Sequence, residues 1–435
     1  MMGHYERLKK VDVEKVSDIE LLQHYEDWIS VMHRSWEIHF TPWYAAYYIY
    51  GLFEDMCREL LGMDDKQPEF KGLMSGFPNA LFKADEELWR LGDRAKQLGL
   101  EQSFLTIEDD EELLSQLQQS EAGRKWLEEL RQFLQEYGWR GANLYDVTVP
   151  SWVEKPSLAL PDIRRAIAKG GSFVLDRERE RLAKERQEGE KDILSRVPAD
   201  KREWFEKLMR AAQWCGRFSE DHAFYCENHI NALGRRVTKE IGNRLAKAGI
   251  IDDPQDVYFL DLEEVRTRVI PAAKGDVHKL VQLRKDQYQR AWGKEPPIFF
   301  GDISALPEMA MKDVIMRFPV AAVPVVKPEL KADLYGSASA PGVVEGLARV
   351  IMSTAESGQI QPGEILVAPN TTPVWTPLFG IVKGVVTDAG GALAHAVIVG
   401  REYGIPVVAG TQDGSRKIKT GDRIRVDGDK GAVYI

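Results

Sequence analysis

The chain has 435 residues, of which 44% are hydrophobic and 29% charged, a balance typical of a globular protein with two or three domains. Its formal net charge of −10 and its lack of a basic cluster disfavour binding to nucleic acid or to an anionic membrane. No apolar run is long enough to span a bilayer and no signal-peptide core begins the chain, while three widely spaced cysteines predict neither a disulfide framework nor a metal site. We therefore expect a cytoplasmic protein.

The first three quarters of the chain are predicted to be mainly helical. An amphipathic pattern covers residues 19–38, and Thr41-Pro42 then predicts an N-cap with proline at the first turn of a new helix that ends at Gly62. Gly138 to Leu158 has no helical period and is interpreted as an ordered loop. Further helices are predicted over 81–98, 107–119, 121–137, from 161, over 177–196, over 201–249 with a bend near Gly216, and over 275–292. A short strand or extended piece is predicted over 256–260.

Residue usage changes near position 330. Ten of the eleven tryptophans precede it, whereas the last hundred residues alternate short β-branched runs with glycine turns. We therefore predict a multidomain α and α/β protein, with a helical acceptor-binding domain over 1–320, an extended linker over 321–335 and a compact β/α/β domain over 336–435. Strands are expected at 348–352, 365–367, 384–387, 407–409, 423–426 and 432–435.

The stretch from Val385 to Thr411 carries the strongest functional signal. A short strand is interrupted by Gly390-Gly391, and an apolar-faced helix is expected to follow His395 and to end at Gly404. The histidine thus stands where a glycine turn meets the N-terminus of a helix, which suits an anionic group because unpaired N–H groups and the positive dipole end meet there. A lone histidine at such a turn is more often a capping or surface residue.

This stretch resembles the swivelling phosphohistidine domain of the PEP-utilising enzymes over about the last 100 residues. The residues that carry the resemblance are Gly390, Gly391, His395, Arg401, Glu402, Gly404 and Pro406. The resemblance implies that His395 is the phosphorylated nucleophile and that the two glycines approach the phosphoryl oxygens. Many members have Thr-Ser or Thr-Cys directly before the histidine, but this chain has Leu393-Ala394. Thr387 or Asp388 is a candidate for orienting the ring, although a plain turn role is the simpler interpretation of both.

A looser resemblance over residues 30–265 is to the acceptor-binding domain of the phenylphosphate synthase and rifampin phosphotransferase branch. It rests on SWEIHF at 35–40, YGWRG at 137–141, Pro150 with Trp152, and DHAFYCEN with the following helix at 221–265. Trp36, Phe40 and Trp43 are candidate acceptor-binding residues.

His39, which the Thr41-Pro42 pattern places in the turn before a helix, is a candidate general base. A histidine that ties helices together in a core is the commoner alternative. Arg140, in a loop between Gly138 and Gly141, is a candidate ligand for phosphoryl oxygens or a structural arginine at a helix end. His222 and Tyr225 are candidate pocket residues, and a role as core-facing aromatic residues is slightly favoured for them.

Together these resemblances imply a phosphohistidine-carrying subunit of a dikinase-type phosphotransferase. The sequence contains no GxxxxGK[ST] motif and no ATP-grasp loop, so Mg²⁺ and ATP are expected on a separate ATP-grasp subunit, with AMP and phosphate as overall products. The chain leaves no room for a PEP barrel, so PEP is not expected as substrate. An aromatic hydroxyl compound, phenol above all, is the expected acceptor. The alternatives are a component of a rifampin-like antibiotic phosphotransferase and a non-catalytic phosphocarrier or regulatory module.

Overall fold

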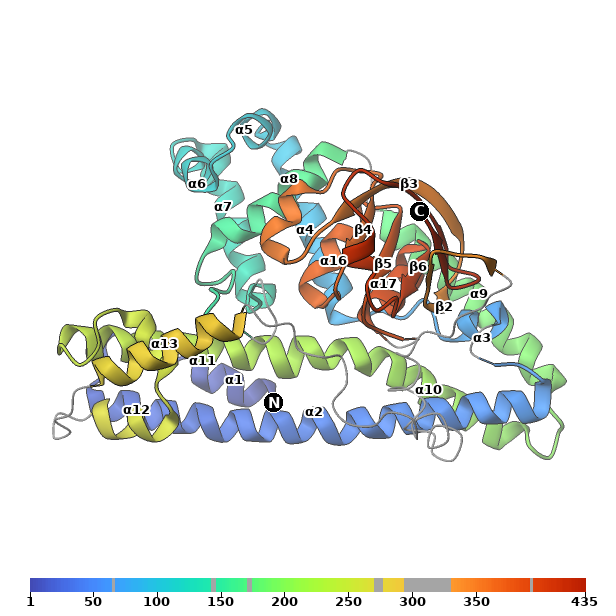
Figure 1. Cartoon of the computed structure of the whole chain (residues 1–435), viewed down its shortest axis with the longest axis horizontal. Coiled ribbons are helices and arrows are strands. Elements are labelled where there is room, and N and C mark those ends of the chain that lie inside the picture. Colours follow the sequence, from blue (N-terminus) through green and yellow to red (C-terminus); the bar gives the residue numbers. More distant parts are fainter. Residues whose placement is uncertain (65–66, 142–145, 170–173, 270–276, 293–329, 392–393) are drawn as a thin grey trace. The chain divides into compact units, whose positions relative to one another are not determined.

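The computed structural model describes residues 1–64, 67–141, 146–169, 174–269, 277–292, 330–391 and 394–435 (Figure 1). The contacts divide the chain into two compact units, each made of three segments. Unit 1 comprises Met1–His39, Trp139–Ser151 and Tyr225–Ser304, and unit 2 comprises Phe40–Gly138, Trp152–Phe224 and Ala305–Ile435. The predicted linker over 321–335 lies mostly outside the described residues, so the predicted domain boundary there stays a prediction.

Unit 1 is helical around one apolar core. Leu21, Trp28, Ile230 and Val237 are among its buried residues, and the indole of Trp28 donates a hydrogen bond to the carbonyl of Ile230 at 2.9 Å. The sequence from Trp139 to Ser151 is held at its ends by a β-bridge between Gly141 and Ser151. The helices of this unit are α1 (Met2–Lys9), the first part of α2 (Asp18–Leu61), α11 (His229–Lys247), the 3-10 helix η3 (Pro254–Phe259), α12 (Leu262–Val269) and α13 (His278–Trp292).

Three of the sequence predictions for these helices are wrong. Helix α2 runs without a break through Pro42, so His39 lies inside a helix and not in a turn. The bend expected at Gly216 is instead a π-helical segment, η2 (Ala223–Asn228), between α10 (Arg202–His222) and α11. Residues 256–260 are not a strand, because the Asp253 side chain caps a 3-10 helix in a reciprocal capping box with Asp256.

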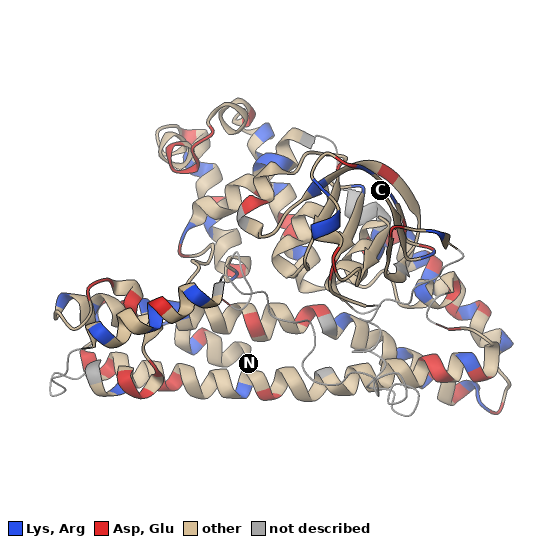
Figure 2. Ribbon diagram, viewed as in Figure 1, with Lys and Arg blue, Asp and Glu red and all other residues tan. Residues whose placement is uncertain are grey.

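Unit 2 contains helices and one sheet. Three of its helices begin at side-chain caps that the sequence provides, Asn79 before α4, Asp109 before α6 and Ser120 before α7. Its helices before residue 330 are the end of α2, α3 (Pro68–Leu73), α4 (Ala80–Gln97), α5 (Glu101–Thr106), α6 (Asp110–Leu117), α7 (Glu121–Tyr137), η1 (Pro156–Ala159), α8 (Leu160–Lys169), α9 (Val174–Arg196) and α10. Figure 2 shows both signs of charge interspersed along the helices, as the mixed sequence over 177–196 predicts.

Residues 330–435, called the sheet domain below, form a single mixed sheet of eight strands in the order β1-β8-β7-β3-β4-β5-β6-β2. Strands β3 to β6 are parallel and buried on both faces from β4 to β6, which explains their continuous β-branched sequences. The strands are β1 (Leu334–Tyr335), β2 (Ser337–Ala340), β3 (Val343–Val350), β4 (Ile365–Ala368), β5 (Gly384–Thr387), β6 (Val407–Ala409), β7 (Arg423–Asp427) and β8 (Ala432–Tyr434). The short helices are η5 (Thr354–Gln359), η6 (Pro373–Trp375), α16 (Thr376–Phe379), α17 (His395–Tyr403) and α18 (Gly414–Lys417).

Candidate functional site

The site in the sheet domain lies beyond the carboxyl ends of β4 and β5. These strands are parallel neighbours, so the segments that follow them leave the sheet at the same edge. The segment after β4 leads into η6 and α16, and the segment after β5 leads into α17 (Figure 1). Two stretches that are about 20 residues apart in sequence thus meet where α/β sheets commonly bind ligands.

His395 is the first residue of α17, as predicted. Helix α17 ends at Tyr403, and Gly404 caps it in the left-handed conformation with φ of 66°. Gly390, in the preceding turn, has φ of 119°, which residues with a side chain rarely adopt. Gly391 contributes its carbonyl, which accepts a hydrogen bond from the Ala394 amide at 2.9 Å. Leu393, which stands where many related sequences have a hydroxyl residue, lies outside the described residues.

Two threonine hydroxyls contact the imidazole of His395. Nδ1 lies 3.0 Å from Oγ1 of Thr371, and Nε2 lies 3.1 Å from Oγ1 of Thr376. The Thr376 hydroxyl donates its only proton to the carbonyl of Pro373 at 2.7 Å, so it can only accept from Nε2–H. The lone pair of the ring is therefore on Nδ1, where the Thr371 hydroxyl donates to it. The edge of the ring also meets Phe379, at 5.9 Å between ring centroids.

The His395 ring is held in its neutral form. Burial disfavours the charged imidazolium and lowers the pKa of His395 to about 3. A neutral imidazole keeps one lone pair at all pH values near neutrality, and a lone pair is what a nucleophile requires. The electrostatics of this site therefore favour nucleophilic chemistry over acid catalysis by His395.

Neither residue proposed for orienting the ring has that role in this structure. Thr387 donates its hydroxyl proton to the carbonyl of Ala389. Asp388 accepts hydrogen bonds from the backbone and hydroxyl of Ser415, and burial raises its pKa. Both side chains stabilise the turn after β5. Thr371 and Thr376 were missed, although the hydroxyl-rich sequence TTPVWT was the available signal.

Replacing Thr376 by valine tests the contact with Nε2. Valine has the same shape but no hydroxyl, so Nε2–H loses its acceptor, which we expect to lower the free energy of unfolding by about 1–3 kcal/mol. We also expect the ¹⁵N shifts of His395 to change from one tautomer toward a mixture of two. Thr372→Val is the matched control, because the Thr372 side chain makes no capping hydrogen bond to η6. Unchanged ¹⁵N shifts in Thr376→Val would contradict the assignment.

Two of the proposed acceptor residues lie together in unit 1. His39 is only 6% exposed, and its Nδ1 lies 3.0 Å from Oε1 of Glu227, which is 1% exposed. The ring of Trp36 meets His39 edge to face at 5.0 Å between centroids. Ser35, one helical turn before His39, donates to the carbonyl of Cys226 at 2.7 Å and so ties α2 to the residue that precedes Glu227. Glu227 was not among the residues predicted for the site.

The other proposed residues belong partly to unit 1 and partly to unit 2. Arg140 is 1% exposed in unit 1, and Tyr225 in the same unit is 38% exposed, so Tyr225 does not face a core. His222 belongs to unit 2, where its ring stacks on Phe218 and its Nδ1 lies 3.0 Å from the Phe218 carbonyl. Phe40, also in unit 2, is 45% exposed. The backbone of Trp43 belongs to α2, and its side chain is outside the described part of the structure.

Two family models match the chain, one over helical segments and one within the sheet domain. Residues 39–220 match the fourth domain of rifampicin phosphotransferase, and residues 360–431 match the mobile domain of the PEP-utilising enzymes. Residues 360–431 thus carry a mobile domain of the PEP-utilising enzymes, and the similarity to rifampicin phosphotransferase is consistent with that family. The predicted resemblance is thereby confirmed. Among the described residues, no helix has both the length and the apolar character that crossing a membrane requires.

Three curated relatives are similar over most of the chain. Chondramide synthase of Chondromyces crocatus is 31% identical over 414 residues, which is 92% of this chain and 10% of that protein. An uncharacterized phosphotransferase of Bacillus subtilis strain 168 is 28% identical over 92% of this chain and 47% of its own length. Rifampicin phosphotransferase of the same strain is 30% identical over 76% of this chain and 37% of its own length. The chain thus spans less than half of each of these relatives.

Proposed function

We propose that this chain is the phosphohistidine-carrying and acceptor-binding part of an ATP-dependent phosphotransferase. The observation that carries the proposal is the position of the His395 imidazole at the N-terminus of α17, beyond the carboxyl ends of two parallel strands, with a threonine hydroxyl at each ring nitrogen. The names of its relatives, two of which are phosphotransferases, support the same class of reaction.

The first half-reaction places a phosphoryl group on His395. A ring nitrogen attacks the β-phosphorus of ATP, an N–P bond forms, and the P–O bond to AMP breaks. Water then cleaves the bond between the β- and γ-phosphates, which releases the γ-phosphate as inorganic phosphate and leaves one phosphoryl group on the ring. Because Thr371 and Thr376 occupy both nitrogens in this structure, one of these contacts must open before the attack. The amides at the start of α17 and the turn at Gly390 are suited to the oxygens of the bound phosphoryl group. Mg²⁺ and ATP would be bound by a separate ATP-grasp subunit.

The second half-reaction transfers the group to a hydroxyl compound. The acceptor oxygen forms the new P–O bond, the N–P bond breaks, and the hydroxyl proton passes to a base, for which we propose His39. The carboxylate of Glu227, 3.0 Å from Nδ1, would compensate the charge that His39 gains. Trp36 against the His39 ring favours an aromatic acceptor, and phenol is our first choice.

A second class of acceptor can be tested in the same label-transfer experiment. Because residues 39–220 match a rifampicin phosphotransferase domain, rifampicin is a reasonable alternative acceptor. A third alternative is that the chain is a phosphocarrier, which takes up the phosphoryl group but transfers it to no small molecule.

Label transfer separates these alternatives. The chain is incubated with a partner ATP-grasp subunit, Mg²⁺ and ATP labelled at its β-phosphate, and acid-labile label is expected on the protein. The isolated labelled chain is then mixed with phenol, with rifampicin or with buffer. Loss of label to phenol supports the first proposal, loss to rifampicin supports the second, and label retained with both supports the carrier. If no acid-labile label forms, the proposal fails as a whole.

Replacing His39 by asparagine tests its part in the second half-reaction. We expect label uptake at His395 to stay normal, while release to the acceptor falls by about 10²–10⁴-fold, which is the usual contribution of a general base. His33→Asn is the control, because His33 is exposed on the same helix. Normal release by His39→Asn would remove His39 from the mechanism and leave the role of His395 intact.

A further inference from the structure

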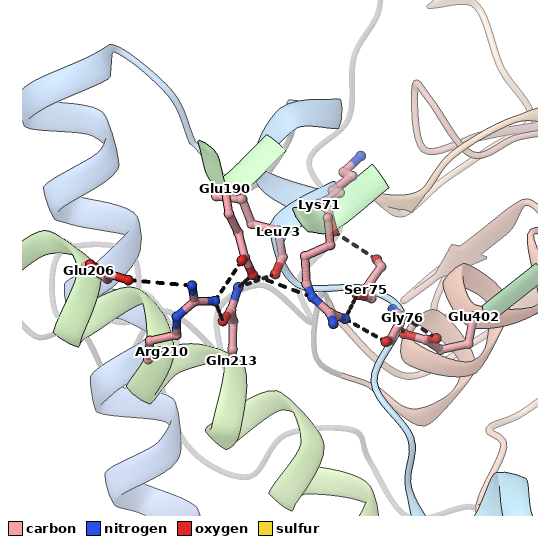
Figure 3. A network of polar contacts seen from close by, with 10 residues as sticks. Lys71, Leu73, Ser75, Gly76, Glu190, Glu206, Arg210, Gln213 and Glu402 are labelled. Carbon is pink, nitrogen blue, oxygen red and sulfur yellow. Dashed lines mark hydrogen bonds and ion pairs between the residues drawn. The ribbon is translucent and has the colours of Figure 1, made fainter. Parts of the chain in front are cut away.

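A buried carboxylate in the sheet domain has no part in the chemistry proposed above. Glu402 lies near the end of α17 and is 4% exposed. Most of the other buried side chains of this helix are apolar, so a charged residue is not required for its packing. A carboxylate of this kind is expensive to bury and therefore must be compensated by hydrogen bonds or charges. Its partners lie outside the sheet domain, in the helical segments of unit 2 (Figure 3).

The direct partner of Glu402 is the turn between α3 and α4. The Gly76 amide donates to both carboxylate oxygens, at 2.8 Å and 3.1 Å. Gly76 has φ of 76°, and a Cβ there would lie 2.7 Å from the backbone nitrogen of Ala183 in α9. Glycine is thus required at the one position where the turn both touches α9 and points its amide at α17.

Helix α9 holds this turn from the other side. Nη1 of Arg186 donates to the carbonyls of Ser75 and Gly76, at 2.7 Å and 2.6 Å. Its guanidinium also lies over the ring of Phe77, 3.9 Å from the centroid. Arg186 is oriented in turn by Glu190, 3.5 Å away, which also accepts hydrogen bonds from Arg210 and Gln213 (Figure 3). Helix α9 therefore holds the turn through contacts that do not involve α17.

Two further contacts flank the carboxylate. Lys71 of α3 donates to the carbonyl of Ala338 in β2 at 2.6 Å, and Tyr403, next to Glu402, donates to Asp85 of α4 at 3.2 Å. All of these contacts join the helical segments to the sheet domain, and they surround the end of the helix whose first residue is His395.

We propose that Glu402 is the anchor of a docking surface through which the sheet domain binds α3, α4 and α9 of its own chain, and that this contact opens when the domain is released. The Gly76 amide, the Arg186-held turn, Lys71 and Asp85 form the receiving side. The docking surface is independent of the reaction proposed for His395, and its test needs no activity.

Protonation supports a reversible contact. Burial raises the pKa of Glu402 to about 7, against the combined effect of the Gly76 amide and of the charges on Arg401, Arg179 and Arg186, which lower it. The docked state has the higher pKa, so it takes up a proton that the released state, with an ordinary carboxyl, does not hold near neutrality. Docking is therefore favoured at low pH and is weakened as the pH rises through about 7.

Hydrogen exchange of the Gly76 amide measures the contact in the full chain. Glu402→Ala is expected to lower the protection factor of the peptide over 71–79 by about tenfold or more, since the buried Gly76 amide loses its hydrogen-bond acceptor. Glu402→Gln keeps the shape and an acceptor oxygen, so we expect a smaller loss. Glu345→Gln, an exposed residue on β3 of the same domain, is the matched control and should have no effect.

The pH dependence of this protection distinguishes an anchor from a residue that only fills space. In the unmodified chain, protection corrected for the intrinsic exchange rate should fall several-fold between pH 6 and pH 8. In Glu402→Gln this pH dependence should be lost. Protection of 71–79 that is unchanged in Glu402→Ala, or a pH dependence that survives in Glu402→Gln, would overturn the proposal.

Discussion

His395→Ala should take up no acid-labile phosphate in the reconstituted label experiment. The substitution removes the nitrogen on which the N–P bond would form, and no other group in the described site can replace it, because the hydroxyls of Thr371 and Thr376 are weak nucleophiles that lack an adjacent base once the imidazole is gone. We therefore expect a fall to background, which in a functioning phosphotransferase is several orders of magnitude. The measurement is acid-labile label per mole of chain, before and after mild acid.

Two control variants test whether the loss of label is due to misfolding or to the removal of any histidine. His395→Asn keeps a polar side chain near the threonine hydroxyls and should also fail to label, while its thermal unfolding stays close to that of the unmodified chain. His33→Ala removes an exposed histidine from α2 and should label normally. Full labelling of a folded His395→Ala chain would end the proposed function.

The sequence predicted best those elements whose signals are local. Helix α7 was predicted over its observed bounds, because Ser120 caps it and the apolar residues follow a helical period up to Tyr137. Strands β5 and β6 were likewise predicted at their observed bounds, since short β-branched runs between glycine and proline leave few alternatives. The start of α17 at His395 and its end at Gly404 followed from the same kind of signal.

The failures come from tertiary contacts that override local preference. Proline inside a helix removes one hydrogen bond and clashes with the preceding turn, at a cost of about 3 kcal/mol, so a helix boundary at Thr41-Pro42 was a reasonable expectation. The packing of the apolar residues on both sides of it, such as Trp28 and Phe53, is sufficient to keep α2 continuous. Local patterns contain no information on the size of that contribution.

The candidate site shows the same difference between residues with a local sequence signal and residues brought in by tertiary contacts. Gly390 and His395 could be predicted because they are close in sequence and form a motif. Thr371 and Thr376 contact the same imidazole only because β4 and β5 are adjacent and parallel, which no local pattern reveals. Glu227 approaches His39 across 188 positions of sequence, in a π-helical segment whose register differs from that of the α-helix assumed for it. Such partners can be found only once the fold is known.

Gly390→Ala should damage the site more than any other substitution outside the imidazole itself. With φ of 119° a side chain is strained at this position, which costs on the order of 1–3 kcal/mol. The added Cβ would also lie 2.8 Å from the Cβ of Ala394, the residue directly before His395. The chain can relieve that overlap only by moving the start of α17, and misplacement of a reacting group by about 1 Å can cost about 10²-fold in rate.

We therefore expect Gly390→Ala to melt at a lower temperature and to label about 10²-fold more slowly, while its far-ultraviolet circular dichroism stays unchanged because the buried strands β4, β5 and β6 are not touched. Gly358→Ala is the matched control, since no atom lies within 4 Å of the added Cβ and its φ is not positive. It should be neutral or slightly stabilising, because alanine restricts the unfolded chain. If Gly390→Ala were to melt and label like the Gly358 variant, the turn would not be what positions His395, and the role of the glycine pair in phosphoryl binding would have to be abandoned.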